Sequence, residues 1–418
     1  MVDPLLKALP KWTLVGYPRL VRLNPAVAWK TRGNGAVALT LSSDEHSADD
    51  GQAHVPSDQE LADVLERASR VVAAGAALDD PSCGPGVVVS PRTLDMELYQ
   101  EAVATIVPAE RASRAIVQAQ ALSWSAGTRR GIIGAAAALA WPQQSVTFEI
   151  LAYRHPSRIG TPRDVSDRCL ERIEGAIPDS FHTRGRRGSA LSVPSSPCPV
   201  LLGIRARSAS HLPKVVDLLE GEAPASWRIF VTNHATDDHR LFAQVPSAPT
   251  GGATLQPFRP YDVIVEIGPP SRRRRGGHLL RGATLLQGRM RIAQITLAAF
   301  EPTKGLRNVL EALAPGDRCE VFGLCTRPDV LNLAKVRPLV VAPRPPPEPR
   351  PRCCDRSMRS CGRAGGLRCR TCGKRVEWQR PAAASSTASP VEVGRWYEVP
   401  AEARGHLHRP EAFDAQPP

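Results

Sequence analysis

The residues of this 418-residue chain best suited to ligand chemistry lie at 29–39, where cationic and hydroxyl side chains lead into a Gly-Asn-Gly turn and an apolar run. Gly33 and Gly35 permit backbone conformations with positive φ and leave room for a ligand beside the main chain. Successive N–H groups of such a turn can bind an anion, and Lys30 and Arg32 place positive charge where phosphate oxygens would lie. The pattern predicts a polyphosphate-binding turn; a plain hairpin turn with solvated basic residues is the alternative that the same spacing allows.

The charge of the chain is unevenly distributed. The formal net charge is +13, yet residues 42–101 contain 13 acidic and 3 basic side chains, which leaves +23 on the remainder. A basic body of this size favours a polyanionic partner, and nucleic acid is the usual one. A solvated surface that is merely rich in arginine is the alternative.

The composition argues against secreted and membrane-spanning proteins. The N-terminus has no sustained apolar region of the kind found in signal peptides. The longest apolar run, Gly131 to Trp141, is too short to cross a bilayer. We therefore expect a soluble, cytoplasmic protein in which the ten cysteines are reduced or hold metal.

Apolar periodicity predicts several helices in the first third of the chain. Ser57 and Glu60 have the spacing of a capping box at the start of a helix. Two more helices are expected at 94–106 and 109–122. Residues 42–56 are acidic and polar without periodicity, so we expect a loop there.

Two further places could bind a nucleotide or its metal. If the Ala-rich run after Gly131 is helical, its N-terminus and Arg130 would form a second anion site, or the same residues could simply pack a helix closely in a core. Asp79 and Asp80 could bind a hard cation such as Mg²⁺. Ordinary turn chemistry ahead of Pro81 is the alternative for that pair.

The segments around the glycine turn resemble one family. Residues 17–25, Tyr-Pro-Arg-Leu-Val-Arg-Leu-Asn-Pro, and then Trp29 to Ala36 are similar to the nucleotide-binding segment of the archaeal isoleucine-tRNA 2-agmatinylcytidine synthetase (TiaS) family. The resemblance extends nearly to the C-terminus through further segments, namely 129–135, 153–161, 233–237, 299–304 with Arg307-Asn308, and 396–407.

The resemblance implies an ATP-dependent ligase that joins agmatine to C2 of the wobble cytidine in the CAU anticodon of a minor isoleucine tRNA. ATP, carried with Mg²⁺, would phosphorylate the C2 carbonyl oxygen, and agmatine would displace the phosphate. The residues expected to bind ATP are Arg22, Asn24, Lys30, Thr31, Arg32, Gly33, Asn34, Gly35, Arg130 and Gly131.

The chain departs from the family pattern at its beginning. In the family, a strand with an Asp-Asp-Thr-Asp motif precedes the Tyr-Pro-Arg segment, and those carboxylates hold Mg²⁺ on ATP. Here only Met1 to Lys11 stand before that region, with Asp3 as the sole acid. The catalytic residues are therefore unassigned. We expect that the recorded start is too far downstream; loss of the kinase step is the alternative.

The pattern and the resemblance together predict an α+β multidomain protein. We expect a kinase-like α/β domain, truncated at its N-terminus, at 1–165, with an inserted or adjoining α/β segment around 42–128. The remaining expected parts are a ferredoxin-like segment at 193–250, an OB-fold barrel at 258–340, a zinc ribbon at 350–380 and a C-terminal segment at 381–418.

The barrel is the expected tRNA-binding part. Residues 261–336 have the order of three strands, a helix and two strands that is typical of an OB-fold, and such barrels bind single-stranded nucleic acid through a basic groove. Lys304, Arg307 and Asn308 are the expected tRNA contacts, and Phe300 could stack on a base or belong to the core. A non-catalytic nucleic-acid-binding protein, or an inactive relative, is the rival reading.

The cysteines near the C-terminus predict a zinc site. Cys369 and Cys372 have the spacing of one half of a zinc ribbon. By resemblance Cys354 is the third ligand, and Cys353 or Cys361 would supply the fourth. Residues 233–239, Asn-His-Ala-Thr-Asp-Asp-His, could form another zinc site or an acid–base pair, with a hydrogen-bonded corner as the alternative.

Overall fold

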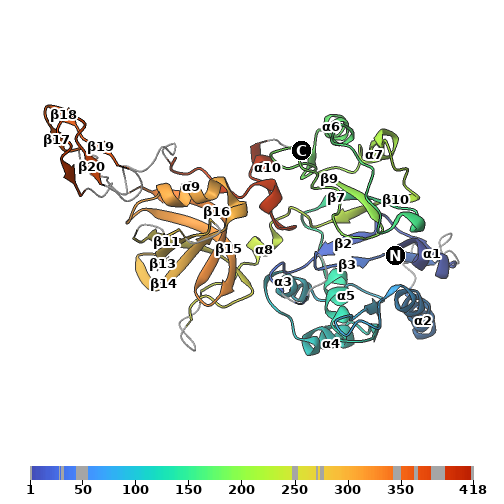
Figure 1. The fold of residues 1–418 in the computed structure, drawn as a ribbon. Coiled ribbons are helices and arrows are strands. Elements are labelled where there is room, and N and C mark those ends of the chain that lie inside the picture. The colour runs from blue at the N-terminus through green and yellow to red at the C-terminus, as the bar shows by residue number, and fades with distance from the viewer. Residues whose placement is uncertain are drawn as a thin grey trace. The chain divides into compact units, whose positions relative to one another are not determined.

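The computed structural model describes residues 2–27, 29, 33–43, 55–246, 253–269, 272–273, 277–341, 350–361, 366–377 and 391–415. The chain forms two compact units. The first contains Met1–Asp262, Leu324–Pro328 and Val399–Pro418, and the second contains Val263–Gly323 and Asp329–Glu398. Figure 1 shows the helices and strands of both units.

The first unit is built on one six-stranded sheet with the order β3-β2-β10-β7-β9-β8. Its strands are β2 (Arg19–Arg22), β3 (Gly35–Ala38), β7 (Thr147–Tyr153), β8 (Ser180–Phe181), β9 (Val200–Ala206) and β10 (Ser226–Thr232). β10 runs parallel to β2, and the other neighbours are antiparallel. The expected boundary near residue 165 falls inside this sheet, because β7 pairs along its length with both β9 and β10.

Two groups of helices cover this sheet (Figure 1). Helices α3 (Met96–Ala104), α4 (Ala109–Gln118) and α5 (Gly131–Leu139) pack on the β2–β3 end, where they form a core with Val21 and Leu23. Helices α6 (Asp167–Ala176) and α7 (Lys214–Leu218) form a second core with β7 and β9. A small third cluster joins α1 (Val2–Ala8) to β2 and β10.

Among the remaining elements of the first unit, the predicted start of one helix is confirmed and the predicted end of another is wrong. Helix α2 (Asp58–Gly75) begins with the expected capping box, in which Ser57 and Glu60 bond reciprocally. Strand β1 (Trp12–Leu14) pairs with β4 (Leu41–Ser43), and β5 (Gly86–Val89) pairs with β6 (Leu122–Ser125). The prediction of a helix up to residue 122 was wrong, because the chain turns through a positive φ of 53° at Gln120 and then enters β6.

A buried ion pair and several short helical turns complete the first unit. Arg154 donates from Nε and Nη2 to the Glu222 carboxylate, each at 2.6 Å. Both side chains are almost fully buried. The short turns are η2 (Pro156–Arg158), α8 (Asp238–Leu241), η5 (Ala401–Ala403) and α10 (Ala412–Ala415).

The second unit contains the expected OB-fold barrel. Its strands are β11 (Arg259–Ile267), β12 (Arg272–Arg273), β13 (Leu279–Gln287), β14 (Met290–Ala299), β15 (Arg318–Arg327) and β16 (Val330–Val340). β11 and β13 close the ring β11-β15-β16-β14-β13, and β14 runs parallel to β16. Turn η3 (Glu301–Thr303) and helix α9 (Gly305–Ala312) lie between β14 and β15. This connectivity is that of an OB-fold.

The cysteine-rich region of the second unit consists of short strands, namely β17 (Arg352–Cys353), β18 (Arg356–Ser357), β19 (Arg359–Ser360), β20 (Leu367–Arg368) and β21 (Arg375–Val376). β22 (Tyr397–Glu398) pairs with β16. Within the described ranges, none of the helices has the length and apolar character needed to traverse a lipid bilayer.

Candidate functional site

The glycine turn lies at the end of the connection from β2 to β3, directly before β3. The strands pair in the register Arg22 to Gly35, and the N–H of Leu23 donates to the carbonyl of Asn34 at 2.8 Å. The positive φ values belong to Gly33 (82°) and Asn34 (38°), whereas Gly35 is already the first residue of β3. The glycine turn is therefore the end of a twelve-residue connection, residues 23–34, that joins β2 to β3. Three predicted phosphate ligands, Lys30, Thr31 and Arg32, lie outside the described residues.

Asparagine side chains fix the β2–β3 hairpin in place. The amide nitrogen of Asn24 donates to the carbonyls of Thr105 (3.0 Å) and Phe258 (2.8 Å), and its oxygen accepts from the N–H of Ala26 at 2.9 Å. Asn34 donates to the Asn24 carbonyl at 2.8 Å. Both donors of the buried Asn24 amide are used by the protein, so this side chain clamps the hairpin and does not have the free donor expected of a phosphate ligand.

The backbone at the N-terminus of α5 packs closely against the backbone at the start of β5, and both segments have glycine at the contact. A Cβ built on Gly131 would lie 2.3 Å from the backbone nitrogen of Gly86, and one built on Gly86 would lie 2.3 Å from the nitrogen of Ile132. Only glycine allows the two backbones to come this close. Arg129, two residues before Gly131, takes a φ of 59°. The guanidinium of Arg130 then lies 5.0 Å from the centre of the Trp29 ring.

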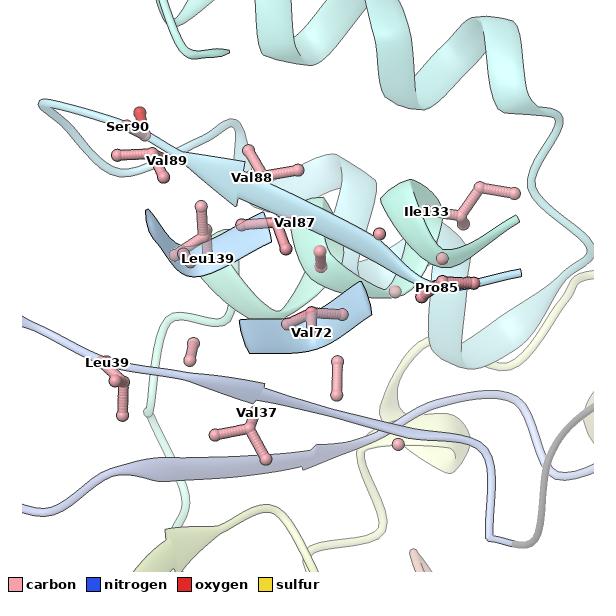
Figure 2. Close-up of a pocket in the computed structure, with 18 of the residues that line it drawn as sticks. Val37, Leu39, Val72, Pro85, Val87, Val88, Val89, Ser90, Ile133 and Leu139 are labelled. Carbon is pink, nitrogen blue, oxygen red and sulfur yellow. The ribbon is translucent and has the colours of Figure 1, made fainter. Parts of the chain in front are cut away.

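A cavity of about 840 Å³ lies between the hairpin, α2, β5 and α5. Its lining includes four of the predicted ATP-binding residues, namely Asn34, Gly35, Arg130 and Gly131. Most of the remaining wall is apolar, and Figure 2 shows Val37 and Leu39 across from Val87, Val88 and Val89 of β5, with Ile133, Leu139 and Val72 beside them. A concave, largely apolar cavity with a few polar groups is typical of small-molecule sites, and the volume is in the usual range.

Arg22 lies on the other face of β2 from this cavity. Its neighbours Val21 and Leu23 point into the core with α3–α5, so the alternation of a strand turns Arg22 away. Its guanidinium lies 3.7 Å from the buried carboxylate of Glu149, which also contacts Arg205 at 2.9 Å. Arg22 therefore does not line the cavity, although its side chain lies beside Gly35 on the opposite face of the strands. Sequence reasoning missed Glu149, although a charged residue within an apolar strand was a usable signal.

Residues 233–239 form a hydrogen-bonded corner. The hydroxyl of Thr236 donates to the Asn233 carbonyl at 2.8 Å, and the hydroxyl of Thr147 donates to the His234 carbonyl at 2.7 Å. Burial lowers the pKa of His234 well below its usual value and raises the pKa of Asp238. The hydroxyl of Tyr99 donates to Asp238. These contacts give the corner a structural role.

Asp79 and Asp80 occupy an exposed turn. The Oδ1 of Asp80 accepts from the backbone N–H and the hydroxyl of Ser82, at 2.8 and 2.7 Å, and these bonds lower the pKa of Asp80. This is the arrangement of an Asx turn. In the described ranges, the four cysteines treated below are the sole group of three or more His, Cys, Asp or Glu side chains close enough to share a metal ion. The hydrogen bonds fit ordinary turn chemistry, and a Mg²⁺-binding role for Asp79 and Asp80 stays a prediction.

The four predicted tRNA contacts lie at the start of α9. Phe300 is half-buried and packs edge-on against His278, with ring centres 4.9 Å apart. Lys304 pairs with Glu301 at 2.5 Å, and Arg307 donates to the carbonyl of Gly277 at 2.6 Å. The side chain of Asn308 is exposed. Of these residues, Lys304 and Asn308 are the accessible ones, while Arg307 ties α9 to the β12–β13 connection.

Four cysteines gather at the tip of the second unit. The Sγ atoms of Cys353, Cys354, Cys369 and Cys372 all lie within 4.8 Å of one another. Zn–S bonds of about 2.3 Å place tetrahedral sulfurs about 3.8 Å apart, so the cluster has the right size for zinc. Of the two candidates for the fourth ligand, Cys353 lies in the cluster.

The loops of the cluster are shaped for metal ligands. Gly373, with a φ of 77°, turns the chain so that its N–H donates to the Cys369 carbonyl at 3.0 Å. The N–H groups of Cys372 and Thr371 point at the Cys369 sulfur and lower its pKa to about 6. All ten cysteines are within the described residues, and all are free thiols.

These parts together characterise a multidomain enzyme that combines a nucleotide-sized cavity, an OB barrel and a four-cysteine metal cluster. Residues 4–128 match the TiaS TCKD domain and residues 129–239 match the TiaS FLD domain. The isoleucine-tRNA 2-agmatinylcytidine synthetase TiaS of Archaeoglobus fulgidus is 32% identical over 412 residues, covering 95% of this chain and 89% of the relative. That of Methanopyrus kandleri is 32% identical over 415 residues, covering 95% and 88%. The chain belongs to the TiaS family.

Solved structures of the family agree with this fold. The complex of TiaS with its isoleucine tRNA and ATP superposes with a TM-score of 0.77 at 28% identity, covering 100% of this chain and 93% of that one. The complex of TiaS with the same tRNA, AMPCPP and agmatine gives a TM-score of 0.73 at 26% identity, covering 98% and 91%. The α+β multidomain architecture expected from the sequence is thus confirmed.

Proposed function

We propose that this protein uses ATP to conjugate agmatine to C2 of the wobble cytidine in a minor isoleucine tRNA, the reaction named in its curated relatives. The observation that carries the proposal is the match of the TiaS TCKD and FLD domains over residues 4–239, followed by an OB barrel and a cysteine cluster. ATP transfers a phosphoryl group to the C2 oxygen, and the agmatine amine then forms the C2–N bond as the C2–O bond to phosphate breaks. A cytoplasmic location is part of the proposal, because tRNA is the substrate.

The cavity of the first unit is the proposed nucleotide site. Asn34 and Gly35 from the hairpin and Arg130 and Gly131 from α5 line it. Helix N-termini and glycine turns present N–H groups to phosphate, and the guanidinium adds charge. Lys30, Thr31 and Arg32 directly precede the hairpin turn in the sequence and belong to the same proposed set.

Zinc is the proposed metal of the cysteine cluster. Cys353, Cys354, Cys369 and Cys372 would hold it as four thiolates, and its contribution would be a cross-link between short strands that bury few apolar side chains. Lys304 and Asn308 are the proposed tRNA contacts of the barrel. Arg307 and Phe300 would support them.

The proposal is tested by incubating the purified chain with labelled agmatine, ATP and a transcript of the isoleucine tRNA with the CAU anticodon. We expect label in the tRNA only when ATP is present and only when the wobble base is cytidine. A transcript with uridine at that position is the matched control. Absence of ATP-dependent label, in a protein that binds the tRNA, would instead support a non-catalytic nucleic-acid-binding protein.

A further inference from the structure

The C-terminal segment returns to the first unit and is fastened to the corner after β10. The N–H of Ala235 donates to the His406 carbonyl at 2.8 Å, and the N–H of Asp237 donates to the Leu407 carbonyl at 2.7 Å. Leu407 is 1% exposed and belongs to the core beneath α3–α5. The segment is therefore an integral part of this unit.

The ring of His406 lies beside the glycine turn. A Cβ built on Gly33 would be 3.2 Å from Nε2 of His406 and 2.6 Å from Nη1 of Arg22. The His406 ring also packs edge-on against His234, with ring centres 4.9 Å apart. Arg22 and His406 therefore both lie on the side of Gly33 on which a Cβ would stand.

Arg22 is itself held on both its backbone and its side chain. Asn233 accepts from the Arg22 N–H at 2.7 Å and donates to the Arg22 carbonyl at 2.8 Å. The guanidinium, whose side chain is 14% exposed, faces the buried Glu149 carboxylate at 3.7 Å. The buried Glu149 carboxylate keeps the Arg22 guanidinium in this position, because leaving either buried charge unpaired would strongly destabilise the fold.

From these contacts we propose that His406 is a positioning residue of the nucleotide site. Together with Arg22 it holds Gly33 and Asn34 at their positive φ values, which are the conformations that aim the turn at the cavity. Backbone in such sparsely populated regions persists when neighbouring groups leave it no alternative. The inference rests on the proposed function for the identity of the ligand, and it makes the C-terminal segment a part of the ATP site.

The test is a double-mutant cycle between His406→Ala and Gly33→Ala, with the ATP dissociation constant measured by calorimetry on the full chain. His406→Ala is expected to raise that constant about fivefold, the equivalent of roughly 1 kcal/mol. Gly33→Ala adds a methyl group against both the Arg22 guanidinium and the His406 ring. Removing the ring relieves part of this crowding, so the double variant should lose less ATP affinity than the product of the two single-variant losses. At saturating ATP, His406→Ala should keep its kcat and its KM for agmatine.

Matched controls separate this contact from general effects. Gly160 has a φ of 89° with nothing within 4 Å of a built Cβ, so Gly160→Ala measures backbone strain alone. His155 is exposed and contacts Ser157, so His155→Ala measures loss of an unrelated imidazole. Both should bind ATP as the unaltered protein does. If His406→Ala fails to fold, His406→Gln retains a planar polar group and is expected to bind ATP about as tightly as the unaltered protein, whereas His406→Leu is expected to bind it more weakly.

Three results would overturn the inference. The first is an unchanged ATP affinity in His406→Ala, and the second is a loss of ATP affinity in the double variant equal to the product of the two single-variant losses. The third is a rise in the KM for agmatine in His406→Ala as large as the rise in the ATP dissociation constant. A different result bears on the proposed function. If the unaltered chain binds no ATP, the nucleotide site itself is refuted, and the positioning role falls with it.

Discussion

The contact between Gly131 and Gly86 provides a sharp test of how the cavity is built. A methyl group on Gly131 would lie 2.3 Å from the nitrogen of Gly86, 2.4 Å from the carbonyl oxygen of Gly84 and 2.5 Å from the carbonyl carbon of Pro85. All three neighbours are backbone atoms, which cannot rotate aside as a side chain can. The variant Gly131→Ala must therefore move α5 away from β5, and with it one wall of the cavity.

The magnitude follows from the geometry. Overpacking of this kind costs about 1–3 kcal/mol, and a forced backbone shift belongs at the upper end. Gly134, one turn further along α5, is the matched control, since a methyl group there would meet only Leu23 and Ala36 at 3.6 and 3.7 Å, which is ordinary contact. Gly134→Ala should be neutral or stabilising by up to about 1 kcal/mol, because alanine is the better helix former.

The assay is urea unfolding of both variants and the unaltered protein, followed by tryptophan fluorescence, with ATP binding measured in parallel. We expect Gly131→Ala to unfold at lower urea than Gly134→Ala and to lose ATP affinity. Equal midpoints for the two variants would refute the close backbone contact. An unaltered ATP affinity in a destabilised Gly131→Ala protein would show that this wall does not shape the ligand site.

Two further predictions concern other parts of the chain. The hydrogen bonds from Arg154 lower the pKa of Glu222 in the folded protein. Above the ordinary glutamate pKa of about 4.3, the unaltered protein should therefore be more stable than Glu222→Gln. This difference in stability should shrink as the pH falls through the lowered pKa of Glu222, as measured by unfolding at several pH values. Cys372→Ser should reduce the zinc content determined by mass spectrometry, whereas Cys361→Ser should leave it unchanged; an equal loss in both would contradict the ligand set.

Local patterns made part of this fold predictable. The capping box at Ser57 depends on two residues three positions apart. The OB-fold has a recognisable order of strands and one helix along the chain, so its presence can be predicted without knowing which strands pair. Strand β6 was missed because it is only four residues long and follows a helix that ends without a proline. A run so short carries little periodicity.

The site was predictable only where it depends on nearby residues. The glycine turn is visible because two glycines flank one asparagine, and its hairpin needs only β2 and β3. The partners of Arg22 are Glu149 of β7 and Asn233 in the corner after β10, and no sequence pattern links either of them to Arg22. Asn24 was assigned to phosphate because a polar residue in a ligand segment gives no sign that its amide is used by distant carbonyls.

The central claim is that the cavity beside the glycine turn holds the nucleotide, and a crystal structure with a non-hydrolysable ATP analogue tests it most directly. The account predicts phosphate oxygens within hydrogen-bonding distance of the turn at Asn34–Gly35 and of Arg130–Gly131, with the base in the apolar part of the cavity. An analogue bound elsewhere on the first unit, with this cavity unchanged, would contradict it.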